Sequence, residues 1–147
     1  MERNLRLAHP FFLMLAIVVT GRWLQSLFGV PYEKGHHVFS IFILTIYSAL
    51  FYGLFTRRWK GYRLLEAVML GALMGLTSQF VILLSTVVSY ALDLRTFFNH
   101  PTALNQPEAV AFGQALLIRA GGLVGNSITA GICAAVGWAI GGLLPEN

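Results

Sequence analysis

The chain has 147 residues, of which 56% are hydrophobic and only 11% are charged, and its formal net charge is +4. Ordinary globular domains carry roughly 25% charged residues, so this composition excludes an ordinary soluble domain. It indicates a single integral membrane domain over residues 1–147. The positive charge does not indicate a nucleic-acid partner, because most of the basic residues lie beside apolar segments, at the level of lipid headgroups.

Four apolar segments follow one another along the chain, and each is close to the ~20 residues that a membrane-spanning helix needs. They cover about residues 10–30, 37–55, 64–92 and 120–144. Four crossings return the chain to the side on which it starts. The sequence therefore predicts an all-α integral membrane protein, with four transmembrane helices in an up-down-up-down bundle.

Basic residues set the expected orientation of this bundle. Arg3 and Arg6 precede the first segment, and the link "RRWKGYR" (residues 57–63) joins the second segment to the third. Cytoplasmic loops of membrane proteins carry an excess of Lys and Arg. We expect a multi-pass protein of the inner (plasma) membrane with both termini in the cytoplasm.

The link before the last segment is the only long one, and it carries a helix-start signal. Asn105 followed by Glu108 has the spacing of a capping box, so a helix is expected to begin near Gln106. Unbroken to Leu144, that helix would be about 58 Å long at about 1.5 Å per residue, nearly twice the ~30 Å hydrocarbon thickness. We predict an interfacial helix over residues 106–118 on the outer face and a kink at Gly121 and Gly122, with a transporter-type broken helix as the alternative.

Small residues cover about half of the circumference of the last segment, and a similar stripe follows the third segment. Helices in lipid associate through close van der Waals contact, which small side chains permit. The arc on the last segment is wide enough to predict two neighbouring helices, one of them from this chain or from another copy. The predicted helix-packing residues are Gly71, Gly75, Ser78, Gly121, Gly125, Asn126, Ala130, Ala134, Gly137 and Gly141.

Polar residues at membrane depth are candidates for a transport or binding site, because such residues are costly there. Arg22 is expected either to bind an anion, a lipid headgroup or a counter-charge, or to hydrogen-bond carbonyl groups as a structural residue. Glu66 is expected to pair with the basic link, Arg63 above all, with a proton- or cation-handling role as the alternative. The full candidate set is Arg22, Gln25, Glu66, Gln79, Arg119 and Asn126.

Metal binding and catalysis have little support in the sequence. His36, His37 and His100 are weak metal candidates, since adjacent residues on a helix point about 100° apart and no ligand motif is present. No metal is therefore predicted, and a haem, pigment or quinone is neither indicated nor excluded. The lone Cys133 has no evident base partner, and no catalytic motif is found.

Three functions remain open at this stage. The leading hypothesis is an oligomeric scaffold or accessory subunit whose small-residue faces bind other membrane helices, from copies of itself or from other subunits. The alternative is a small homo-oligomeric channel or transporter for an ion or small solute. A membrane enzyme or cofactor-binding subunit is the third hypothesis.

Overall fold

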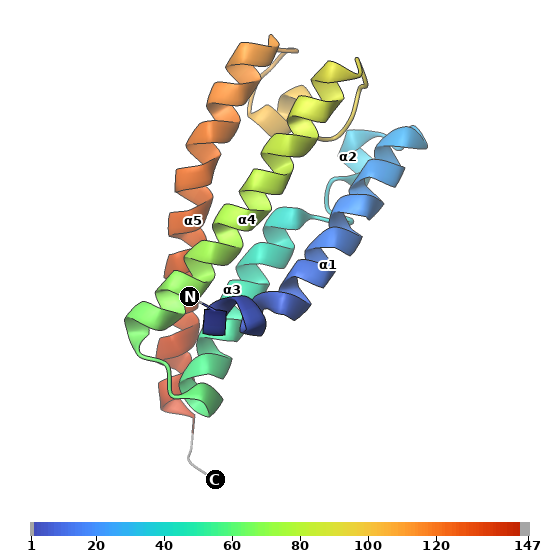
Figure 1. Ribbon diagram of the computed structural model, residues 1–147. Helices are drawn as coiled ribbons and strands as arrows, with labels where there is room; N and C mark the ends of the chain where they lie inside the picture. Colours follow the sequence, from blue (N-terminus) through green and yellow to red (C-terminus); the bar gives the residue numbers. More distant parts are fainter. Residues whose placement is uncertain (1, 145–147) are drawn as a thin grey trace.

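The computed structural model describes residues 2–144 and is all-helical over that range, without a strand (Figure 1). Residue 1 and residues 145–147, the ends of the predicted 1–147 domain, lie outside the described residues. Four long helices are joined by short links and two short helical turns. In chain order the elements are α1 (Glu2–Leu27), α2 (Tyr32–Gly35), α3 (Ile41–Lys60), α4 (Leu64–Ala91), the 3-10 turn η1 (Pro101–Leu104) and α5 (Phe112–Leu143).

The bundle has two chemically different ends. Figure 1 shows α1 and α4 running in one direction and α3 and α5 running back, so that α3 and α5 are parallel to each other. We call the end that holds the start of α1 and the α3–α4 link the basic end, because it carries Arg3, Arg6, Arg57, Arg58, Lys60 and Arg63. The opposite end holds α2, η1 and the links 28–40 and 92–111.

Three helices are long and apolar enough to cross a membrane, namely Arg3–Leu27, Leu64–Ala91 and Phe112–Leu143. The predicted all-helical fold is therefore confirmed over the described residues, with three helices that could span a membrane. The fourth long helix, α3, has 20 residues and carries Arg57, Arg58 and Lys60 in its last turn. By length and composition α3 is not among the candidate spans of the described residues, and the four-span count stays a prediction.

The first helix starts about eight residues earlier than predicted, at Glu2, and contains Pro10. Proline removes one backbone N–H but does not always end a helix. Here the first turn has partners at the basic end: Tyr62 donates a hydrogen bond to Asn4 at 2.9 Å, and Arg3 forms an ion pair with Glu66. These contacts stabilise a helical turn that apolar periodicity alone did not indicate.

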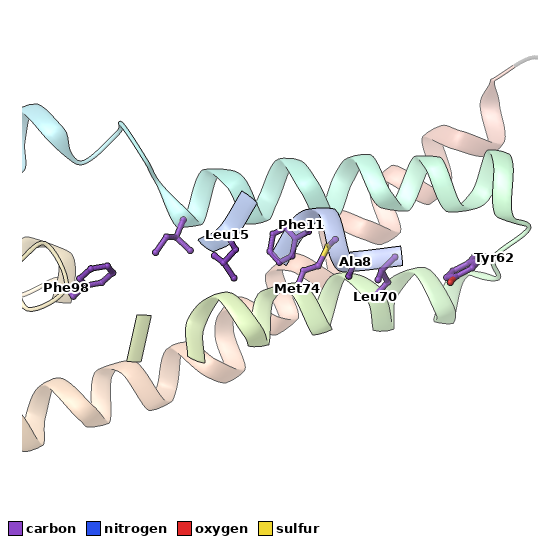
Figure 2. Close-up of a cluster of buried hydrophobic side chains, with 8 residues drawn as sticks. Ala8, Phe11, Leu15, Tyr62, Leu70, Met74 and Phe98 are labelled. Carbon is purple, nitrogen blue, oxygen red and sulfur yellow. The ribbon is translucent and has the colours of Figure 1, made fainter. Parts of the chain in front are cut away.

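The main hydrophobic core lies between α1 and α4. Ala8, Phe11 and Leu15 of α1 are buried against Leu70 and Met74 of α4 (Figure 2). Ile41 at the start of α3, Tyr62 at the basic end and Phe98 at the opposite end complete this cluster. The core fixes α1 beside α4 along the length of the bundle, whereas α5 is packed on the far side of α3 and α4.

The structure of α5 contradicts the predicted helix start near Gln106, a separate interfacial helix over residues 106–118 and the alternative of a broken helix at Gly121 and Gly122. Residues 106–111 are not helical, and α5 runs unbroken from Phe112 to Leu143 through Gly121 and Gly122. Asn105 does not cap α5, because it closes η1 in the left-handed conformation with a φ of 54°. Tyr90 donates a hydrogen bond to the carbonyl of Val110 at 2.7 Å. This bond ties the chain to α4 just before α5 begins, which delays the start of the helix.

Candidate functional site: an arginine-lined cavity

Close contact between α3 and α5 sets the geometry of the site. A Cβ atom built on Gly137 would overlap the carbonyl oxygen of Leu50, and one on Gly53 would overlap the carbonyl oxygen of Ala134. The two backbones therefore touch, as small residues allow in membrane helix pairs. Gly141 similarly lies against Leu54.

The α4–α5 contact uses the small residues of both helices. A Cβ atom on Gly71 would lie 2.5 Å from the carbonyl oxygen of Ala130, and one on Gly75 would lie 2.5 Å from that of Asn126. Ser78 instead faces α3, where its hydroxyl is 2.7 Å from that of Thr45. The two neighbours of the small-residue arc on α5 are thus α3 and α4 of the same chain.

Two of the predicted packing residues are not brought into contact. Gly121 and Gly125 are exposed, and a Cβ atom on either would meet nothing within 4 Å. Both lie in the first half of α5, which is the half away from the basic end, where no part of α3 lies alongside.

The short length of α3 leaves space in the bundle. Because Leu50 meets Gly137 and Leu54 meets Gly141 in a parallel pair, the same register sets Ile41 beside Ile128. The first 16 residues of α5, about 24 Å at 1.5 Å per residue, therefore have no α3 alongside. A cavity of about 630 Å³ occupies this space between α1, the start of α3, α4, α5 and the links of the opposite end.

Four of the six polar candidates from the sequence line this one cavity: Arg22 from α1, Gln79 from α4, and Arg119 and Asn126 from α5. They come from three helices that are far apart in the chain. No acidic side chain is among the described residues that line the cavity.

Both arginines are half-buried, and their hydrogen-bond partners are neutral. Arg119 donates from Nη2 to the carbonyl of Phe98 at 2.7 Å and from Nε to the hydroxyl of Thr86 at 3.2 Å. Arg22 donates from Nη1 to the carbonyl of His36 at 3.3 Å, and its guanidinium lies 5.2 Å from the ring centroid of Phe97. A guanidinium has five N–H donors, so both groups retain donors for a ligand.

Amide groups form the deeper part of the cavity. The Asn126 side-chain amide donates to Gln79 Oε1 at 2.6 Å, and the Gln79 amide donates to the carbonyl of Arg119 at 3.3 Å. Toward the basic end, the glycine contacts hold the backbone of α5 directly against α3 and α4.

The start of α3 also faces the cavity, which sequence reasoning missed. Residues 40–43 line it, and Ser40 caps the helix by accepting a hydrogen bond from the Ile43 amide at 3.4 Å. The first N–H groups and the positive end of the helix dipole favour negative charge nearby. A serine directly before the apolar run at residue 41 was the available signal for this start.

The other two polar candidates lie elsewhere. Glu66 is at the basic end, where it accepts a hydrogen bond from the Arg63 amide at 2.8 Å and forms an ion pair with Arg3. The Arg63 partner is thus its backbone amide rather than its guanidinium. Gln25 is half-buried, its Oε1 has no hydrogen-bond partner, and it does not line the cavity.

His36 and His37 line the cavity with their rings close together rather than diverging as expected, whereas His100 lines a neighbouring pocket. His36 follows α2 and His37 lies in the next turn, so the helical angle of about 100° does not apply, and their ring centroids are 3.7 Å apart. His100 stacks on Tyr32 at 4.3 Å between ring centroids. Over residues 2–144, no group of three or more His, Cys, Asp or Glu side chains is placed to hold a metal ion.

Comparison of the chain with protein-family models, with curated proteins and with solved structures finds no match. The cavity itself is therefore the basis for a functional conclusion.

Proposed function

We propose that the chain is a four-span membrane protein that binds the oxyanion group of a ligand, a phosphate or a carboxylate, in the cavity between Arg22 and Arg119. The observation that carries the proposal is that two guanidinium groups, from α1 and α5, line one cavity without an acidic side chain among its described lining residues.

The energetics of buried charge support an anionic ligand. Charged side chains within membrane-spanning segments are rare, and they normally pair with another group or mark a substrate site. The guanidinium fork matches phosphate and carboxylate oxygens in a bidentate arrangement. The amides of Gln79 and Asn126 and the start of α3 add neutral donors around the same space.

The proposal includes α3 as the fourth crossing, with the basic end in the cytoplasm and an inner-membrane location. The six basic residues at one end support this orientation through the positive-inside rule. Gly141 packs beside Arg57 at the basic end, and Arg119 lies 22 residues earlier on α5, about 33 Å away at 1.5 Å per residue. That is close to the ~30 Å hydrocarbon thickness, so the arginines are at the far membrane boundary.

Transport and association are the two roles in which such a site can act. A carrier would expose the cavity at the opposite end while the glycine contacts of α3, α4 and α5 close the basic end. Association stays a second candidate because an apolar groove runs along the outer side of α4 and α5 between Val68, Ala72 and Gly131. The particle mass in mild detergent discriminates between a monomeric carrier and an assembly.

The binding proposal is tested with purified protein in a neutral detergent and glycerol 3-phosphate as the soluble probe, by calorimetry. We expect Arg22→Gln to weaken binding about tenfold or more, equivalent to about 1.4 kcal/mol. Arg22→Lys should restore only part of the affinity, because Lys lacks the bidentate fork. Lys34→Gln, which removes an exposed charge at the same end, is the matched control. Equal affinity in Arg22→Gln and Lys34→Gln would overturn the proposal.

A further inference from the structure

We infer that the oxyanion is the phosphate of an anionic lipid, which enters the cavity sideways from the leaflet opposite the basic end, between the start of α3 and α5. This inference rests on the proposed function and names the ligand class of the same site.

Apolar side chains of α3 and α5 line one part of the cavity, and two of them are exposed on the surface of the bundle. Phe42 and Ile43 line it from α3 and are 56% and 41% exposed, and Ile118 lines it from α5. These side chains lie on the same cavity as the two arginines. A lipid with its phosphate between the guanidinium groups would therefore keep its acyl chains against apolar side chains, outside the protein.

The water-facing side next to Arg22 is covered by an aromatic layer. The Tyr32 ring stacks on His100 and makes an edge contact with Phe97 at 5.2 Å between centroids. Gly35 packs against Phe97 so closely that a Cβ atom there would lie 2.8 Å from the ring. The same Phe97 ring, which contacts both Tyr32 and Gly35, also contacts the Arg22 guanidinium. A soluble anion would have to pass this layer or its rim, whereas a lipid headgroup already lies at the depth of the arginines.

The size of the cavity also fits a headgroup. Its volume of about 630 Å³ falls in the range of about 300–1,000 Å³ that is typical of sites for organic ligands. An inorganic phosphate ion alone would leave most of this space to water. A phosphate that carries a glycerol or a larger polar group would contact the arginines and the Gln79–Asn126 pair together.

The inference is tested by photo-crosslinking in nanodiscs of phosphatidylcholine that contain a minority of phosphatidylglycerol. A photoreactive residue replaces Ile118, which lines the cavity, or Leu117, which is 75% exposed and does not line it. We expect Ile118 to capture phosphatidylglycerol about tenfold above its share of the bilayer, and Leu117 to capture both lipids in proportion. Arg22→Gln should remove the enrichment at Ile118.

Two outcomes separate this inference from the function on which it rests. Capture at Ile118 in proportion to lipid composition, together with arginine-dependent binding of glycerol 3-phosphate, would overturn the lipid and leave a soluble ligand. Proportional capture with no binding of the soluble probe would overturn both. If Arg22→Gln is poorly folded, Asn126→Ala is the second variant, because it removes one donor from the deeper part of the cavity. Unchanged enrichment of phosphatidylglycerol at Ile118 in a folded variant would count against the inference.

Discussion

The side chains of Gln79 and Asn126 form the one direct hydrogen bond between side-chain amides of α4 and α5 among the described residues, at 2.6 Å. Gln79 is buried, so removing its partner leaves Oε1 without a donor from the protein. Unsatisfied buried acceptors cost about 1–3 kcal/mol, although hydrogen bonds in membrane helices average about 0.6 kcal/mol. We expect Asn126→Ala to lower the free energy of unfolding by about 1 kcal/mol, measured by titration with a denaturing detergent.

Thr129→Ala is the control for that substitution. Thr129 is exposed on the same helix, and its hydroxyl bonds only to the carbonyl of Gly125 within α5. We expect its free energy of unfolding to stay within about 0.5 kcal/mol of the original, as for surface substitutions. An equal decrease in the free energy of unfolding in Asn126→Ala and Thr129→Ala would mean that the Gln79–Asn126 hydrogen bond does not stabilise the bundle.

At the scale of elements, the α3–α5 contact should tolerate no added methyl group. In Gly137→Ala the new Cβ would overlap the backbone carbonyl of Leu50, which cannot rotate away as a side chain can. Overpacking of this kind costs about 1–3 kcal/mol. We expect Gly137→Ala to lower the midpoint of thermal unfolding, whereas Gly125→Ala in the same helix, with nothing within 4 Å, should leave it unchanged or raise it. A lower midpoint for Gly125→Ala than for Gly137→Ala would contradict the observed packing.

The long helices were within reach of sequence analysis, but their ends were not. Apolar runs identified the segments that became α1, α3, α4 and α5, because only helices satisfy their own backbone groups in lipid. The capping signal of Asn105 and Glu108 failed, since Asn105 instead closes η1 and Tyr90 holds Val110. Pro10 likewise hid the start of α1, which contacts with Tyr62 and Glu66 stabilise. Boundaries set by tertiary contacts do not follow from local patterns.

At the scale of the whole molecule, the proposed topology places residues 28–40 and the 61–63 link on opposite sides of the membrane. In a variant with Cys133 replaced by Ala, we expect a cysteine at position 34 to react with an impermeant maleimide from outside intact cells. A cysteine at position 60 should react only after the membrane is opened. The reason is that α3 joins these two positions and would be the second of four crossings. Labelling of both positions from the same side would show that α3 does not cross the membrane, and three crossings would remain.

The site was predictable in its residues but not in its shape. Polar side chains are energetically costly within a membrane, and for that reason the sequence marked four residues one by one as candidates for a site. The structure shows that these four, Arg22, Gln79, Arg119 and Asn126, line one cavity. The cavity exists because α3 begins beside the middle of α5, a relation set by the register of glycine contacts and not by either segment alone. The same register explains why Gly121 and Gly125, expected to pack, are exposed.

The backbone contact of α3 with α5 has a consequence for natural variation. A side chain at position 53 or position 137 requires the two helices to separate, and both positions lie in the same contact. In relatives of this protein, a larger residue at one of them should therefore be accompanied by change at the other, or at Leu50 and Ala134. Such paired change would widen the helix spacing and, with it, the space that the two arginines share.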